Sequence, residues 1–166
     1  LNILNRRGME RIKLNKKINL SENELFVYQN SFITIDDRGN LVEIDTEGKV
    51  TINKSLNIES ILVSNRNTIV TMFENKININ NVSKKLPLSS YTKPQIFEIN
   101  SKIYISTTDI DNNLVYLFDS SGRIIEGFPI FGNTEIDMVY NNKSKSLKII
   151  VGTNNSEISL IEIKRN

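Results

Sequence analysis

Short segments with alternating apolar and polar residues recur along the whole chain. Residues 76–79 read Lys-Ile-Asn-Ile, and residues 157–160 read Glu-Ile-Ser-Leu. Alternation of this kind is typical of a β-strand with one buried face. Asn, Gly, Ser and Asp separate these segments and favour tight turns. No apolar run approaches the roughly 20 residues that a membrane-spanning helix needs, so none is expected.

One of these segments repeats together with the turn that follows it. Copies occur at residues 1–9, 41–49, 76–84 and 114–123, with the turn marked by Gly8, Gly48, Ser83 and Gly122, and a final copy without its turn occupies residues 157–163. The period is about 38 residues, the size of one supersecondary unit in a repeat protein.

Three further kinds of strand fit around this repeated segment. First strands are predicted at residues 25–30, 61–65, 95–100 and 136–141, and each ends at an Asn suited to a tight hairpin. Second strands, the most continuously apolar, are predicted at residues 32–36, 68–73, 102–106 and 147–152. Fourth strands start at the glycine turns, at residues 8–14, 48–52 and 122–126, and are more polar, as an outer edge strand should be.

Four short antiparallel strands in each unit are typical of the blades of a β-propeller. We therefore predict an all-β fold and one repeat domain spanning residues 1–166, with about four four-stranded blades. The blade units lie approximately at residues 1–15 (partial), 25–56, 60–90, 95–130 and 136–163. Residues 1–15 either complete the last blade of a four-bladed ring or belong to a larger ring of about seven or eight blades, which we favour. A sandwich, a partial barrel and a β-solenoid are the alternative folds.

The composition excludes several kinds of chemistry. The chain has no Ala, the best helix former, and no Cys, His or Trp. Without Cys, thiol catalysis and thiolate metal sites are impossible. Without His, the commonest general base and the commonest metal ligand are also missing. We expect no catalytic residues, no cofactor and no metal site.

Basic residues gather near the start of the chain, although the net charge is only +2. Arg6, Arg7, Arg11 and Lys13 are candidate partner-binding residues, with Lys16 and Lys17 close behind them. A solvated outer strand is the simpler interpretation, and we favour it. No aromatic residues are interleaved with these charges to stack on bases, so a nucleic-acid partner is not expected.

Three local motifs suggest a site but have simpler explanations. Residues 109–113 alternate oxygen ligands as a calcium loop does, but Leu114 replaces the required Gly, so a polar hairpin is expected. The carboxylates of Asp36 and Asp37 are adjacent and point to opposite faces of a strand, so a turn is expected. Phe128 and Phe131 form either a ligand patch or an apolar plug between blades, and we favour the plug.

The last third of the chain resembles a known family of repeats. Residues 115–119, 121–129 and 149–161 are similar to blades of bacterial quinoprotein-like and FG-GAP-like β-propellers, and the match extends over residues 100–163. This resemblance implies the propeller fold and a location in the bacterial periplasm or at the cell surface, with the cytoplasm as the alternative. The missing Trp disfavours WD-type repeats and quinone-binding enzymes.

These observations favour a non-catalytic scaffold or protein-binding module that is part of a larger chain or assembly. The alternative is a propeller enzyme or carbohydrate-binding domain with a site at the mouth of the central channel, built from Tyr28, Glu98 and Tyr140. A third hypothesis is electrostatic attachment through residues 6–17, which must weaken steeply with salt.

Overall fold

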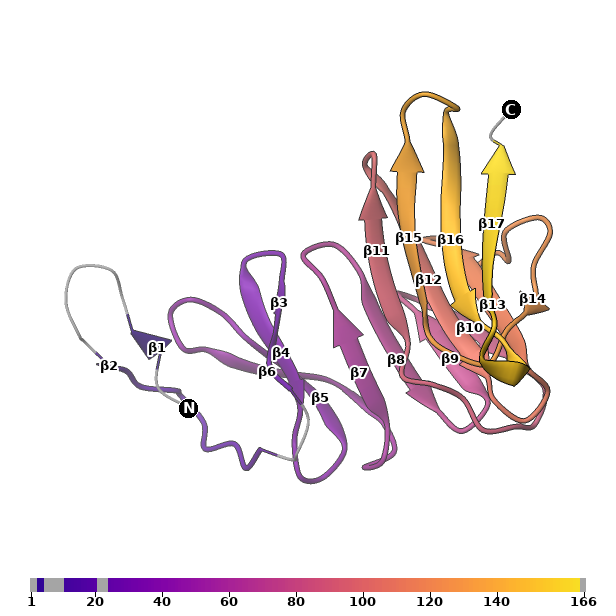
Figure 1. Cartoon of the computed structure of the whole chain (residues 1–166). Coiled ribbons are helices and arrows are strands. Elements are labelled where there is room, and N and C mark those ends of the chain that lie inside the picture. The colour runs from indigo at the N-terminus through magenta and orange to yellow at the C-terminus, as the bar shows by residue number, and fades with distance from the viewer. Residues whose placement is uncertain (1–2, 5–10, 21–23, 165–166) are drawn as a thin grey trace. The chain divides into compact units, whose positions relative to one another are not determined.

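The computed structural model describes residues 3–4, 11–20 and 24–164 (Figure 1). The chain divides into two compact units, Leu1–Phe73 and Glu74–Asn166, and each is treated by itself below. Within the described residues, the one helical element is a 3₁₀ turn, η1 (Asn154–Ser156). No helix in this part of the chain has the length and hydrophobicity to cross a membrane.

The strands form small antiparallel sheets in which neighbours along the chain are neighbours in the sheet. One sheet contains β3 (Phe26–Tyr28), β4 (Ser31–Ile35), β5 (Asn40–Ile44) and β6 (Val50–Ser55). The next contains β7 (Ile61–Ser64), β8 (Ile69–Phe73), β9 (Lys76–Ile79) and β10 (Val82–Lys85). A third contains β11 (Gln95–Ile99), β12 (Lys102–Asp109), β13 (Leu114–Asp119) and β14 (Ile130–Phe131). The last contains β15 (Ile136–Asn141), β16 (Ser146–Gly152) and β17 (Ile158–Lys164), and β1 (Ile3–Leu4) pairs with β2 (Arg11–Ile12).

This arrangement confirms the predicted all-β class with blade-like sheets. The second strands are largely buried, as expected, with three consecutive buried residues in both β4 and β8. The fourth strand β10 is exposed throughout, and β6 is exposed after its first residue. Outer strands therefore carry the polar residues, which keeps the sheet edges solvated.

The fourth strand of the third sheet differs from the prediction. It was expected at residues 122–126, but Ile124 makes only an isolated bridge to Phe118. The chain turns at Gly127, where φ is +88°. It then returns as β14, in which Ile130 and Phe131 pair with Val115 and Leu114. The run from Gly127 to Gly132 thus contains an edge strand of this sheet and leads into the connection to the next sheet.

The core of the N-terminal unit lies on the two faces of the β3–β6 sheet. On one face, buried Ile33, Ile35, Leu41 and Leu62 form a cluster. On the other face, buried Val42, Ile44 and Val50 form a second cluster, with Leu14 and Ile18 packed against it. Since successive side chains of a strand alternate between faces, the pattern of Leu41, Val42 and Ile44 supplies both clusters.

The core of the C-terminal unit lies between its last two sheets. Buried Val115 and Leu117 of β13 share a cluster with Leu147, Ile149 and Val151 of β16. These β16 residues occupy alternate positions and therefore one face of the sheet. The β15–β17 sheet thus uses one face to cover the sheet before it.

Candidate functional site

The segment of residues 13–20 is tied to the N-terminal sheet at two places. The Asn15 backbone N–H donates to the Gly48 carbonyl at 3.0 Å, and the Asn15 side-chain oxygen accepts from the Val50 N–H at 2.9 Å. At the other end, the Asp37 N–H donates to the Asn19 carbonyl at 3.0 Å. The backbone of the segment is therefore held at both ends against the sheet.

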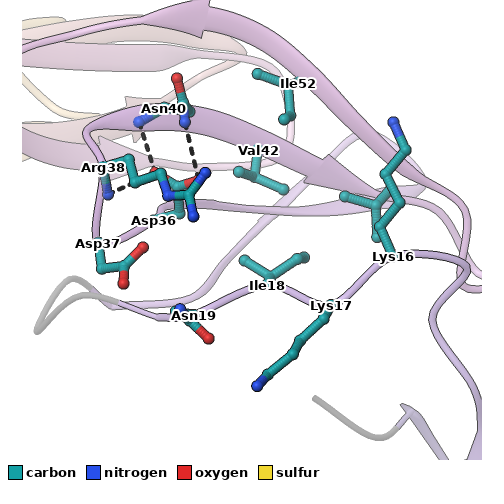
Figure 2. A pocket seen from close by; sticks show the side chains of 11 residues that line it. Lys16, Lys17, Ile18, Asn19, Asp36, Asp37, Arg38, Asn40, Val42 and Ile52 are labelled. Atoms are coloured by element: carbon teal, nitrogen blue, oxygen red, sulfur yellow. Dashed lines mark hydrogen bonds between the residues drawn. The ribbon is translucent and has the colours of Figure 1, made fainter.

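A pocket of about 130 Å³ lies between this segment and the sheet (Figure 2). Ile18, Val42, Val50 and Ile52 provide its apolar lining, and its polar lining consists of Lys16, Lys17, Asn19, Asp36, Asp37, Arg38 and Asn40. In Figure 2, Arg38 extends across Asp36 toward Val42, Lys16 stands at the opposite end, and Lys17 extends away from Arg38 and Val42. The pocket thus combines an aliphatic surface with one guanidinium.

Asp36 is buried at the base of the turn that carries Arg38. Its Oδ1 accepts the N–H groups of Arg38 at 2.9 Å and Asn40 at 2.8 Å, and its Oδ2 accepts from Asn40 Nδ2 at 3.0 Å. Burial raises the pKa of Asp36. These hydrogen bonds and the nearby Arg38 charge lower it by more than burial raises it, so the net pKa is below its usual value. Asp36 is thus an ionised part of a turn, at the place where the sequence predicted a turn.

A second candidate surface is the face of the β15–β17 sheet that points away from the core. Val139, Ile150, Ile158 and Leu160 are exposed there by 63%, 43%, 72% and 67%. Ile150 and Leu160 are direct cross-strand partners. Lys148 Nζ lies 3.4 Å from Glu162 Oε2 on the same face. We call this surface, defined by Val139, Lys148, Ile150, Ile158, Leu160 and Glu162, the outer face.

The carboxylates of Asp109 and Asp111, at the end of β12 and in the hairpin after it, accept hydrogen bonds from nearby residues. Asp109 is fully buried and accepts hydrogen bonds from Ser89 Oγ, from the Asn112 N–H at 2.9 Å and from Asn112 Nδ2. Asp111 accepts from the Ser90 N–H at 2.8 Å. Within the described residues, no group of three or more acidic side chains is placed to hold a metal ion. The geometry is that of a polar hairpin.

The predicted basic strip is only partly described. Arg6 and Arg7 lie outside the described residues. Arg11 is in β2, and Lys13 follows it with an exposed side chain. The structure therefore leaves the partner-binding role of these four residues a prediction.

Phe128 and Phe131 differ in their surroundings. Phe128 is half-buried and packs against the core cluster of the C-terminal unit. Phe131 is 55% exposed in β14. The two rings therefore do not share one environment, and of the two, Phe128 has the packing that the plug interpretation expects.

The residues proposed for a channel-mouth site are divided between the two units. Tyr28 is at the end of β3 in the N-terminal unit, whereas Glu98 and Tyr140 belong to β11 and β15 in the C-terminal unit. Tyr140 packs against the core cluster. Glu98 is exposed and alternates with Phe97 and Ile99, which pack against that cluster. Glu98 and Tyr140 thus project toward different surfaces.

Comparison with known proteins identifies the fold. No protein-family model matches the sequence, and no curated protein matches it. The computationally designed Ika4 protein is 12% identical with a TM-score of 0.53, over 94% of this chain and 99% of that one. Virginiamycin B lyase from Staphylococcus aureus, in a structure with quinupristin, is 17% identical with a TM-score of 0.52, over 96% of this chain. BBS1N, in a complex with ARL6DN, is 14% identical with a TM-score of 0.53, over 83% of this chain.

The lyase and BBS1N are β-propeller proteins, so the likeness supports a β-propeller repeat fold. The chain spans 61% of the length of the lyase and 50% of that of BBS1N. One is an enzyme and the other was crystallised with a protein partner, so the fold alone does not select an activity.

Proposed function

We propose that the chain is a non-catalytic β-propeller module that binds protein through the outer face of its C-terminal sheet. The supporting observation is the set of four large aliphatic side chains exposed on this one face. Contiguous apolar surface of this kind is typical of interaction sites. The opposite face of the same sheet already packs against the preceding sheet, so stacking is how this sheet buries its apolar residues.

The occupant that fits this surface is the outer face of a second copy of the chain. Its aliphatic residues match the exposed residues of the first copy in kind, and burial of both removes apolar area from water. The charged residues of the outer face are Lys148 and Glu162, and Asp137 and Lys164 lie on the same side of the sheet, so two acidic and two basic side chains are present there. Two copies therefore meet without a net charge to repel them.

Three wider aspects of this function are also proposals. Membership of a larger chain or assembly is supported by the exposed face, since such surface is costly to leave in water. A location in the bacterial periplasm or at the cell surface is supported by the resemblance of residues 100–163 to quinoprotein-like and FG-GAP-like blades. An enzyme or carbohydrate-binding site at the channel mouth remains the alternative, and the different directions of Glu98 and Tyr140 give it little support.

Light scattering coupled to size-exclusion chromatography tests the proposed self-association. The chain is expected to change from one mass of 19.0 kDa to twice that mass as its concentration rises from micromolar to millimolar. Leu160→Glu places a charge in the middle of the contact and should keep the protein monomeric. Leu88→Glu is the matched control, because Leu88 is 85% exposed and lies outside the β15–β17 sheet.

A chain that stays monomeric at millimolar concentration contradicts the proposal. So does a dimer that Leu160→Glu and Leu88→Glu weaken equally, because the contact then lies elsewhere.

A further inference from the structure

We propose that the pocket of the N-terminal unit binds a carboxylate carried on a short aliphatic group. Such a ligand is either a free branched-chain carboxylic acid or the C-terminal residue of a peptide. The proposal concerns the N-terminal unit alone and does not depend on the outer face.

The size and apolar lining of the pocket determine the tail of the ligand. A volume of about 130 Å³ is small beside the roughly 300–1,000 Å³ of sites for drug-sized molecules. Ile18, Val42 and Ile52 offer methyl groups and no hydrogen-bonding atoms to whatever lies against them. One branched aliphatic group of the size of a valine side chain suits this space, and its burial there is favourable.

The Arg38 guanidinium determines the head of the ligand. No hydrogen bond or ion pair is found for this guanidinium among the described residues, although Asp36 lies beside it. The Asp36 oxygens already accept three hydrogen bonds from the turn. The planar donors of Arg38 therefore remain available, and a carboxylate is the group that matches their geometry with two parallel hydrogen bonds.

The backbone around the pocket is positioned before any ligand arrives. Asn15 and Asn19 fix the two ends of the segment that forms one wall. The Asp36 turn fixes the backbone of Arg38. A site held in this way loses little conformational freedom on binding. The lining carries three cationic side chains, Lys16, Lys17 and Arg38, and two carboxylates, Asp36 and Asp37, so its charge is positive overall and attracts an anion at long range.

The test is an NMR titration of the full ¹⁵N-labelled chain, observed at the amides of Val42, Val50 and Ile52. The probes are N-acetyl-Gly-Gly-Val as the free acid, the same peptide with a C-terminal amide, 3-methylbutanoate and inorganic phosphate. We expect saturable binding of the free-acid peptide, and binding of the amide and of phosphate that is weaker by about tenfold or more, since neither offers a carboxylate joined to an aliphatic group.

Arg38→Gln and Arg66→Gln are the matched variants. Both remove an exposed arginine of the N-terminal unit, and only Arg38 lines the pocket. Arg38→Gln keeps the backbone N–H that donates to Asp36, and the amide spectrum without ligand checks its fold. It should weaken binding of the free-acid peptide by about tenfold, whereas Arg66→Gln should leave it unchanged.

The probes also distinguish the two sources of the carboxylate. Equal affinity for 3-methylbutanoate and the peptide identifies a free acid as the ligand, and tighter binding of the peptide identifies a peptide C-terminus. Either result supports the proposal. It is overturned if none of the carboxylates binds, if the amide or phosphate binds as well as the free acid, or if Arg38→Gln and Arg66→Gln have the same effect.

Discussion

Asp119 binds Arg123 twice in the turn after β13. Its Oδ1 accepts the Arg123 N–H at 3.0 Å, and its Oδ2 accepts from Arg123 Nε at 3.1 Å. The first of these bonds, in which an Asp accepts from the N–H four residues later, occurs in two other turns. Asp36 accepts from the Asn40 N–H and Asp45 from the Lys49 N–H, both at 2.8 Å. Each turn has a glycine with positive φ three residues after its Asp. The same local chemistry therefore ends strands in both units.

The glycine of one of these turns gives the first prediction. Gly48 has φ +85°, and a Cβ there would lie 2.6 Å from the Lys13 carbonyl oxygen. Gly48→Ala should therefore cost the backbone strain of a positive φ, about 1–2 kcal/mol, and the further cost of moving residues 12–13. Gly127→Ala is the control, because φ is +88° and nothing lies within 4 Å. Urea unfolding should show the larger loss of stability for Gly48→Ala, and equal losses contradict the packing role.

The ionised carboxylate of buried Asp109 stabilises the folded protein, and this contribution should be lost in acid. Burial raises the pKa of Asp109. Hydrogen bonds from Ser89 and Asn112 lower it by more than burial raises it, so its net pKa in the folded protein is below the usual value. A lowered folded pKa stabilises the protein above the unfolded pKa, and this contribution is lost as the pH falls below about 4. Urea titrations between neutral and acid pH should show a smaller loss for Asp109→Asn than for the parent. Parallel curves contradict the assignment.

The strands could be predicted from the sequence because their apolar residues alternate with polar ones. Second strands such as residues 68–73 and 147–152 were found as β8 and β16 within one residue at either end. The asparagines predicted to suit the hairpins do so in two different conformations. Asn100 adopts positive φ, whereas Asn65 and Asn141 use their side-chain oxygens to accept the N–H two residues later. Both conformations follow from the same residue type, so the sequence does not distinguish them.

The pocket and the outer face could not be predicted in the same way. Arg38 is separated by about twenty residues from Lys16 and Ile18, and the two segments are brought together by the hydrogen bonds of Asn15 and Asn19 and by the packing of Leu14 and Ile18 on the sheet. The outer face needs the register of β15, β16 and β17, because alternation alone shows that Ile158 and Leu160 share a face but not whether it is covered. Both depend on long-range pairing, which a local pattern does not specify.

A buried hydroxyl in β12 gives a third prediction. Ser106 is 1% exposed, and its Oγ has no hydrogen-bond partner among the described residues. Ser106→Ala should leave the free energy of unfolding unchanged or raise it, since a buried unpaired polar group is costly. Thr108→Val is the contrasting change on the same strand, because Thr108 Oγ1 donates to the Thr134 carbonyl at 2.7 Å. Its expected loss is about 1 kcal/mol. Destabilisation by Ser106→Ala means that its hydroxyl has a partner in solution.

Phe128 and Phe131 should contribute differently to stability, because only Phe128 packs against the core. Phe128 packs against the core cluster of the C-terminal unit, and Phe131 is 55% exposed. A fully buried Phe→Ala change costs about 3–5 kcal/mol, so half-buried Phe128→Ala should cost about 2 kcal/mol. Phe131→Ala should cost well under 1 kcal/mol, as exposed substitutions usually do. Urea unfolding of the two variants measures both values under the same conditions. Unchanged stability in Phe128→Ala would contradict its packing role.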